Sequence, residues 1–169
     1  MKREKGEGIY IINKYEMEKA KFTELENTKM KSFFKNSDID KYICNEQSES
    51  KIIYITKNDI ISDYPNINRH LLKYKKILEN KRECKTGRLP WYSLHWYRKP
   101  EIFENEKIVA PQRSITNTFA YNKSSWYASA DVYYINIKSD KKNEINIKYI
   151  LALLNTKIYY LWLYYRGKR

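Results

Sequence analysis

Two segments of the chain concentrate side chains of the types that contact nucleic acids. Residues 88–99 read RLPWYSLHWYRK and hold two Trp, two Tyr, one His and three Arg or Lys. Residues 111–127 read PQRSITNTFAYNKSSWY and contain no acidic residue. Arg can grip the edge of guanine, Gln and Asn can read adenine, and Ser, Thr and Lys hold phosphates. The two segments therefore predict a DNA-contacting set that comprises Arg88, Trp91, His95, Trp96, Arg98, Gln112, Arg113, Ser114, Thr116, Asn117 and Lys123.

The tryptophans of these segments have a second interpretation. Trp91, Trp96 and Trp126 would serve equally well as core residues whose indole N–H is hydrogen bonded. Arg113, by contrast, is surrounded by Ser, Thr and Asn in a polar stretch that reads as a loop. Arg113 is thus the better candidate for a direct DNA contact.

The sequence offers no set of residues suited to catalysis or to metal binding. An adenine methyltransferase needs Asn or Asp before prolines and an aromatic residue, but Leu89 stands at that place before Pro90. Asp59 and Asp63 could begin a Mg²⁺ site for a nuclease, yet Asp near a helix start is more often a cap. Cysteines 44 and 84 and histidines 70 and 95 lack the spacing of a zinc site. We therefore expect a chain without catalytic or metal-binding residues.

Composition and charge point to a basic protein of one domain. The chain has 169 residues, 42% apolar and 31% charged, with a formal net charge of +13. Residues 1–50 carry no net charge, because 10 basic residues face 10 acidic ones, whereas residues 51–169 carry the whole excess. A basic surface favours polyanions such as nucleic acid, although an AT-rich coding genome would also raise the Lys content.

The chain also reads as a cytoplasmic protein with no membrane partner. No stretch reaches the roughly 20 apolar residues of a membrane-spanning helix, and the charged start has no signal-peptide pattern. Two cysteines without a secretory segment are expected to stay reduced.

The pattern of apolar residues predicts an α+β fold with small mixed or antiparallel sheets. Strands are expected at residues 9–12, 52–55, 107–111, 118–121 and within 126–137. Residues 14–34 are expected to be helical in two pieces, because Thr23 and Glu26 have the spacing of a capping box.

Two longer helices are also expected. A basic middle helix should begin near Pro65 and end near Gly87, burying Ile67, Leu71, Tyr74 and Leu78. A C-terminal amphipathic helix should begin near Asn146. Its buried stripe is expected to comprise Ile147, Ile150, Leu151, Leu154, Ile158, Leu161, Trp162 and Tyr165.

Six blocks of the sequence, taken in order, resemble a known domain family. They are KSFFKNSDIDKY (31–42), YPNINRHLLKYKKILENKRE (64–83), GRLPWYSLHWYRK (87–99), KIVAPQRSITNTFAY (107–121), WYASADVYYI (126–135) and KYILALLNTKIYYLWLYYRGKR (148–169). This series is similar to the TaqI-like C-terminal specificity domain. That domain is the target-recognition part of Eco57I-type type II restriction-modification enzymes and of related adenine-specific DNA methyltransferases.

The resemblance implies a domain of residues 1–169 that reads a specific double-stranded DNA sequence and belongs to a longer enzyme. The methyltransferase domain of that enzyme would be its protein partner. The chain itself needs no cofactor, whereas the parent would use S-adenosylmethionine, and Mg²⁺ if it also cuts DNA. Blocks shared across the family suit phosphate contacts, so Arg113, Ser114 and Arg166 are expected to position the duplex. Base readers would then come from loops such as 44–51 or 122–126.

Two other functions fit the same residues. The C-terminal stripe and the aromatics of residues 91–97 could form a protein-interaction module that docks the methyltransferase domain. Alternatively, the aromatic residues could stack on the bases of single-stranded RNA.

Overall fold

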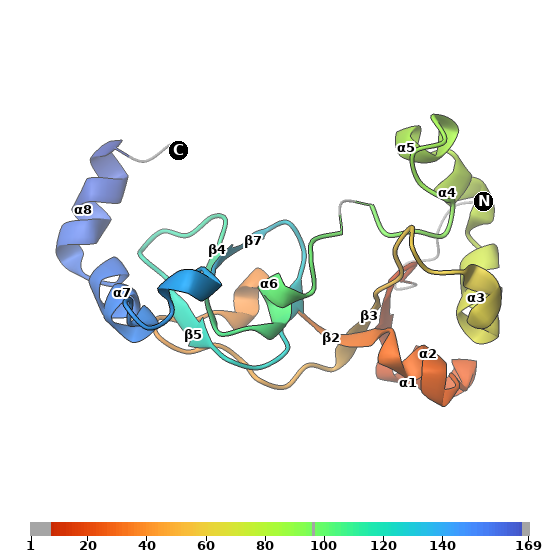
Figure 1. Cartoon of the computed structure of the whole chain (residues 1–169), viewed down its shortest axis with the longest axis horizontal. Helices are drawn as coiled ribbons and strands as arrows, with labels where there is room; N and C mark the ends of the chain where they lie inside the picture. The colour runs from red at the N-terminus through yellow and green to blue at the C-terminus, as the bar shows by residue number, and fades with distance from the viewer. Residues whose placement is uncertain (1–7, 96, 167–169) are drawn as a thin grey trace. The chain divides into compact units, whose positions relative to one another are not determined.

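The computed structural model describes residues 8–95 and 97–166, which fold into two compact units. Unit 1 is built from residues 1–33 and 49–98, and unit 2 from residues 34–48 and 99–169. Helices and small antiparallel sheets occur in both units, which confirms the predicted α+β class (Figure 1).

A short antiparallel sheet forms the base of unit 1. Strand β3 (Ser50–Ile53) lies between β1 (Ile11–Asn13) and β2 (Met30–Phe34). Ile11 pairs with Ile52, and Met30 pairs with Ile53. The predicted strands at 9–12 and 52–55 are therefore present, each displaced by about two residues, within the usual uncertainty of element ends.

Two short helices fill the connection between β1 and β2. Helix α1 (Lys14–Ala20) follows an Asn13 cap, and α2 (Glu24–Thr28) follows a Thr23 cap. Thr23 and Glu26 form the predicted capping box, but the helix expected over residues 29–34 is wrong, because this segment is β2. Pairing with β3 and the burial of Phe33 and Phe34 outweigh the local helical pattern.

The predicted basic middle helix is three helices in the structure. They are α3 (Pro65–Leu72), preceded by a short 3₁₀ turn at Ile61–Asp63, then α4 (Lys75–Glu79) and α5 (Arg82–Lys85). Like charges at Arg69, Lys73 and Lys76, three and four residues apart, disfavour a continuous helix here. Gly87 has φ of 70°, which fits the predicted stop after α5.

The broken helix nevertheless buries the predicted stripe. Ile67, Leu71, Tyr74 and Leu78 pack in one core with residues of all three strands or their extensions, among them Ile12, Met30 and Ile53. The register of the apolar positions therefore survives the two breaks. Each break is a tight turn, in which Tyr74 N–H donates to Leu71 O and Lys81 N–H donates to Leu78 O.

Unit 2 is organised around β4 (Lys107–Pro111), which was predicted with these bounds. It pairs antiparallel with β5 (Ala120–Asn122) on one side and β7 (Val132–Ile135) on the other. The remaining elements are 3₁₀ turns at Asn36–Asp38 and Ser139–Lys141, α6 (Glu101–Glu104), β6 (Tyr127–Ala128), α7 (Ile147–Leu154) and α8 (Lys157–Arg166).

Both faces of β4 are covered. Val109 belongs to a core with Phe34, Ile39, Ala120, Trp126 and Val132, whereas Ile108 packs against Ile147 and Leu151 of α7. Trp126 stacks on Phe34 with ring centroids 4.7 Å apart and donates its indole N–H to Asn45 O at 2.9 Å. The structural interpretation of Trp126 is thus confirmed.

The prediction of a single C-terminal helix is wrong, because the helix is interrupted at Asn155 and Thr156. Thr156 Oγ1 donates to Leu153 O and accepts from Tyr159 N–H, so this residue ends α7 and caps α8. Only the α7 half of the predicted stripe contains buried residues. Within the described residues, no helix has the length and apolar character needed to cross a membrane.

Candidate nucleic-acid interface

The loop between β4 and β5 presents four of the predicted DNA-contacting side chains to solvent. Gln112, Arg113, Ser114 and Thr116 are all exposed. The loop is fixed at its ends, since Gln112 N–H donates to Asp131 O at 2.7 Å and Ser114 Oγ lies 2.8 Å from Thr118 Oγ1. These contacts hold the loop in place and occupy the Ser114 hydroxyl, but they leave the Arg113 guanidinium free, as a recognition loop requires.

Arg113 is the most available cation of this loop. Among the residues that the structure describes, no carboxylate lies within ion-pairing distance of its guanidinium. Five N–H donors are therefore free for a phosphate or a base edge. Lys123, directly after β5, is likewise exposed.

Asn117 has a structural role in the same loop. It is buried, and its Nδ2 donates to Leu154 O at 2.7 Å and to Thr156 O at 3.2 Å. The next anchor is Asn155, whose Oδ1 accepts from Phe119 N–H while its Nδ2 donates to Phe119 O. These bonds join the loop to the α7–α8 turn, and they argue against a base contact by Asn117.

A small pocket lies between this loop and the start of α8. Its volume is about 210 Å³. Lys41 and Lys157 bring two cations to it, and the first turn of α8 adds the positive end of a helix dipole. The pocket, here called the α8 pocket, is lined by Lys41, Thr116, Asn117, Asn155, Thr156, Lys157 and Tyr160. Its cations and hydroxyls suit the oxygens of a phosphate group.

Unit 1 carries a second hollow, at α5, that contains two other predicted residues. Arg88 and His95 line this α5 pocket of about 420 Å³, together with Arg82, Glu83, Thr86, Leu89 and Tyr97. His95 Nδ1 lies 3.1 Å from Glu83 Oε2. No carboxylate among the described residues pairs with the guanidinium of Arg82 or Arg88. The α5 pocket thus offers two forked cations to an anionic ligand.

The remaining predicted residues of unit 1 lie differently. Trp91 is half-buried against the core, with Lys75 Nζ 5.5 Å from its ring centroid, which favours the structural interpretation. Arg98 is half-buried, and its backbone carbonyl accepts from Tyr54. Trp96 lies outside the described residues. In unit 2, Arg166 is exposed at the last turn of α8.

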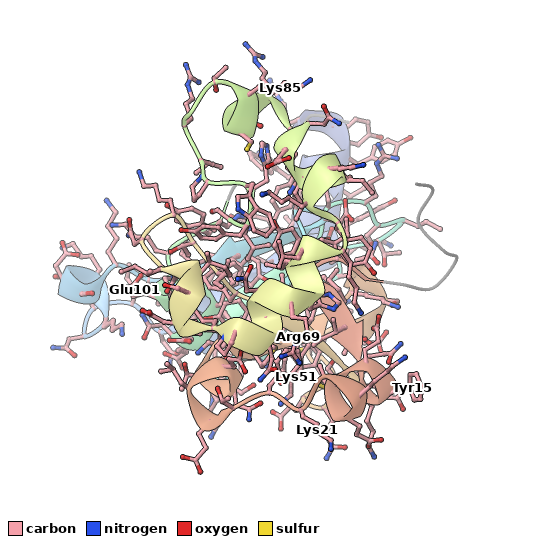
Figure 2. The ribbon with its side chains drawn as sticks, turned by 90° about the vertical axis from the view of Figure 1, so that its right-hand side faces the viewer. Tyr15, Lys21, Lys51, Arg69, Lys85 and Glu101 are labelled. Carbon is pink, nitrogen blue, oxygen red and sulfur yellow. The ribbon has the colours of Figure 1, made fainter. Side chains whose placement is uncertain are left out.

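The helices of unit 1 also carry exposed cations outside the α5 pocket. Arg69 on α3 and Lys85 on α5 both project from the helical face of unit 1 (Figure 2). Lys73 and Lys76 are also exposed, whereas Lys75 forms an ion pair in which its Nζ lies 3.6 Å from Glu79 Oε1. The predicted apolar stripe of this segment is thus buried, while most of its cations are exposed.

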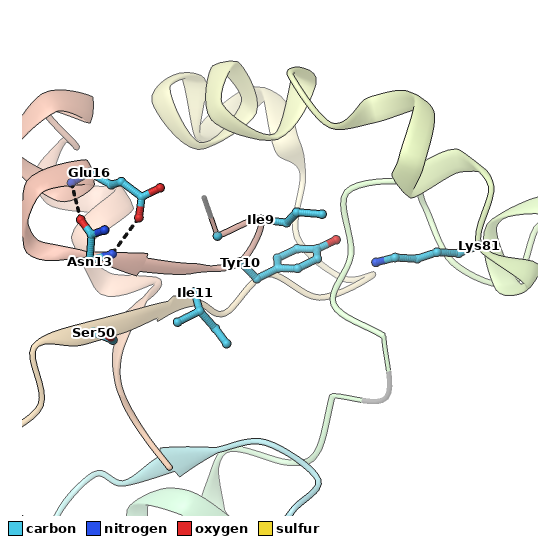
Figure 3. Close-up of a pocket in the computed structure, with 8 residues that line it drawn as sticks. Ile9, Tyr10, Ile11, Asn13, Glu16, Ser50 and Lys81 are labelled. Carbon is cyan, nitrogen blue, oxygen red and sulfur yellow. Dashed lines mark hydrogen bonds between the residues drawn. The ribbon is translucent and has the colours of Figure 1, made fainter. Parts of the chain in front are cut away.

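Lys81 is an exception, because it is half-buried. Its Nζ lies 4.8 Å from the ring centroid of Tyr10, at a hollow of about 460 Å³ (Figure 3). Burial lowers the pKa of Lys81 and raises the pKa of Tyr10, whose hydroxyl donates to Ser93 O at 2.9 Å. No local sequence pattern signals this pair, since Tyr10 and Lys81 are separated by 71 residues.

Asp59, one of the two carboxylates that could have served a nuclease, is used by the fold. Asp59 Oδ2 accepts from the backbone N–H and the hydroxyl of Thr56, and Oδ1 pairs with Lys29. Burial raises the pKa of Asp59, but these contacts outweigh it and hold the pKa below its ordinary value. In the described part of the chain, no three His, Cys, Asp or Glu residues come together as metal ligands could.

Several candidate residues were missed in the sequence. Arg82 and Tyr97 belong to the α5 pocket, and Lys41 and Lys157 belong to the α8 pocket. The signal for Arg82 was present, because eight Lys or Arg stand between residues 69 and 88. Lys41 could not be found, since only the folded chain brings it near residue 116.

The family model described as the TaqI-like C-terminal specificity domain matches residues 6–168 of the 169-residue chain. A search of curated proteins finds no match.

Proposed function

Because the chain belongs to the TaqI-like C-terminal specificity domain family, we propose that it recognises a specific sequence in double-stranded DNA. The family match over nearly the whole chain is the observation that carries this proposal. A specificity domain selects the target and is not itself catalytic, which agrees with the structural use of Asp59 described above.

Three features of the described residues support DNA as the ligand. The β4–β5 loop presents unpaired Arg113 between amide and hydroxyl side chains. The α8 pocket and the α5 pocket each bring two cations to a concave surface. In protein–DNA complexes such cations fix the position of the duplex through its phosphates, and loop side chains read the base edges. We assign the first role to the previously predicted Arg113, Ser114 and Arg166. Two pocket cations, Arg88 and Lys157, join them in it.

We further propose that the parent enzyme is an adenine-specific DNA methyltransferase of a type II restriction-modification system. Its methyltransferase domain would be the protein partner of this chain and would bind S-adenosylmethionine. The described residues do not fit that cofactor, because their two glycines, Gly8 and Gly87, do not form a glycine-rich turn after a strand. Mg²⁺ would be needed only if the parent also cleaves DNA.

Selection from a random pool tests the proposal directly. Purified chain is incubated with a random-sequence duplex library, and bound molecules are recovered, amplified and sequenced over several rounds. We expect enrichment of one short motif, because a specificity domain must distinguish base pairs. Enrichment of no motif at low and at moderate salt would contradict sequence recognition.

A parallel titration separates DNA recognition from RNA recognition. Fluorescence anisotropy is measured with a labelled duplex of the enriched sequence and with single-stranded RNA of the same sequence, at the same salt concentration. We expect tighter binding of the duplex, since the exposed candidates are cations and amides rather than a platform of aromatic rings. Tighter binding of the RNA would favour the stacking function.

A further inference from the structure

Helix α8 exposes an apolar face that should be covered. Ile158, Leu161, Trp162 and Tyr165 are 79%, 44%, 58% and 76% exposed. Their spacing of i, i+3, i+4 and i+7 places them on one side of the helix. These four residues are here called the α8 stripe. No residue of α8 is buried, and the ring contacts of Tyr159 with Trp162 and of Tyr160 with Tyr164 stay within the helix.

Helix α7, which precedes α8, differs from it because α7 packs against the sheet of unit 2. Ile147 and Leu151 of α7 are buried against Ile108 of β4, whereas α8 extends beyond α7 (Figure 1). A ten-residue helix is marginal in water unless one of its faces packs against something. Large exposed apolar patches on soluble proteins commonly mark interaction sites. The α8 stripe therefore has the properties of a contact surface.

The charges around the stripe define the partner. Residues 145–166 contain no Asp or Glu and three cations, Lys148, Lys157 and Arg166. Lys157 directly precedes the stripe and Arg166 directly follows it, so a cation stands at each end. Electrostatic complementarity then requires carboxylates at both borders of the partner's apolar surface.

A second copy of the chain does not meet this requirement. In an antiparallel α8–α8 pair, Lys157 of one copy would face Arg166 of the other. In a parallel pair, identical cations would face each other. Either arrangement brings like charges together around the apolar contact, which costs free energy.

A membrane surface also fits poorly. A helix that lies in a membrane interface has one apolar face and one strongly charged face. Helix α8 has aromatic or aliphatic residues on all sides and charges only at its two ends.

We propose that the α8 stripe is a docking site for an amphipathic helix of a partner protein whose apolar face is bordered by carboxylates. A helix of about ten residues presents its i, i+3, i+4 and i+7 side chains as anchors for a helix in a groove or beside it. The four apolar anchors of the α8 stripe do not line the α8 pocket and are not among the proposed DNA contacts. The docking site therefore stands whether or not the chain reads DNA, although Lys157 and Arg166 at its ends are also proposed phosphate contacts.

Two synthetic peptides test the docking site with the full chain. Both are amphipathic helices of about 20 residues with the same Leu stripe, bordered by Glu in one peptide and by Lys in the other. Trp162 lies in the α8 stripe, so peptide binding is followed by tryptophan fluorescence and checked by calorimetry. We expect the Glu-bordered peptide to bind and the Lys-bordered peptide to bind at least about tenfold more weakly.

A double variant, Ile158→Ser with Leu161→Ser, keeps Trp162 as the reporter and removes two anchors. It should weaken binding of the Glu-bordered peptide by about tenfold or more. Ile145→Ser is the matched control, because Ile145 is also an exposed apolar residue of unit 2, at 39%, but lies outside the stripe and outside the β4–β5 loop. This control should bind the peptide as the unmodified chain does.

Four results would overturn the proposal. They are equal binding of the two peptides, unchanged affinity of the double variant, a dimer in sedimentation velocity that the double variant abolishes, and binding of the stripe to anionic lipid vesicles. A large fall in the melting temperature of the double variant would also oppose it, because the stripe would then be packed within the chain. Duplex binding measured on the same variants reports the DNA function independently.

Discussion

Arg113 is exposed and has no carboxylate partner among the described residues, which makes it the sharpest test of DNA binding at the residue scale. Arg113→Ala should weaken duplex binding, because one free guanidinium fork is removed from the contact surface. Folding stability should change by no more than about 0.5 kcal/mol, as for other exposed positions. Gel-shift titration and thermal melting measure the two effects.

The control for this variant is a second exposed cation of unit 2. Lys142→Ala removes the same charge at the 3₁₀ turn that ends with Lys141, away from the β4–β5 loop in sequence. Equal losses of affinity in both variants would show a diffuse charge effect. Unchanged affinity of Arg113→Ala would remove Arg113 from the site.

Glu26 is the residue on which two helix starts depend. Its fully buried carboxylate accepts from Thr23 N–H at 2.8 Å, and from Asn66 N–H and Ile67 N–H at 2.6 and 2.9 Å. Burial raises the pKa of Glu26, but the hydrogen bonds outweigh it and hold the pKa below its ordinary value. One carboxylate thus ties the start of α2 to the start of α3.

Glu26→Gln should lower the free energy of unfolding by about 2 kcal/mol at pH 7, because an amide N–H₂ would face N–H donors. A lowered folded-state pKa stabilises the protein above the unfolded-state pKa of about 4.3, and the benefit is lost as pH falls through the folded-state value. The unmodified chain should therefore lose more stability below about pH 5 than Glu26→Gln does.

Urea unfolding at several pH values measures this difference. Glu24→Gln is the control, because Glu24 stands exposed in the same first turn of α2. Parallel pH profiles for the unmodified chain and Glu26→Gln would contradict the assignment.

Local residue patterns explain which of these contacts could be predicted. The Thr23–Glu26 capping box follows from a spacing of three residues and was found in the sequence. The bonds from Glu26 to Asn66 and Ile67 span 40 and 41 residues, and no local pattern encodes them. The β4–β5 loop could be predicted from the sequence because it combines Arg, Gln, Ser and Thr without an acidic residue, which is typical of nucleic-acid contacts. The two pockets could not be predicted, because they depend on tertiary contacts.

At the scale of elements, strand β4 was predicted with the correct ends because Pro111 and a continuous apolar run define it. The two helical predictions failed in instructive ways. Residues 29–34 carry a helix-like start but pair with β3, and the long basic segment divides into three helices without losing its buried stripe. Periodicity identified which side chains are buried, but it could not show where the backbone breaks.

Strand β4 also carries an unusual buried cation at its first residue. Lys107 is fully buried, and its Nζ donates to Asn105 O at 3.0 Å and to Ser124 O at 2.6 Å. Burial lowers the pKa of Lys107 to about 8. Because the unfolded-state pKa is about 10.4, the unfolded chain binds more protons between these two values.

Stability should consequently rise with pH above about 8 through this group, by about 1 to 2 kcal/mol between pH 7.5 and 9.5. Lys107→Met should flatten that rise, because the titrating amine is gone. Lys138→Met, at an exposed lysine, should keep it. Chemical denaturation at several pH values in this range measures the free energy of unfolding. An equally steep rise in Lys107→Met would show that the Lys107 amine does not cause it.

For the whole molecule, the excess of Lys and Arg should appear as a strong salt dependence of DNA binding. If about six phosphates are neutralised, the logarithm of the association constant should fall with the logarithm of salt concentration with a slope near −5. Anisotropy titrations at several salt concentrations give the slope. Arg113→Ala should reduce its magnitude by about one if Arg113 contacts a phosphate.

A slope near zero would show that phosphates contribute little, which would contradict a basic DNA-binding surface. The predicted residues fall into a group in unit 1 around Arg88 and a group in unit 2 around Arg113. We predict that both groups contact one duplex. The salt dependence of binding and the comparison of Arg113→Ala with Lys142→Ala address this prediction.

The chain passes between its two units more than once, which determines how DNA specificity could be transferred between family members. Residues 34–48 belong to unit 2 although they interrupt the sequence of unit 1, and they supply Phe34 and Ile39 to the core around Trp126. A chimera that takes only residues 99–169 from a donor enzyme would pack the donor's residues at and around position 126 against the recipient's Phe34. Exchange of both segments together transplants the complete core, so a swap of target preference needs two coordinated grafts.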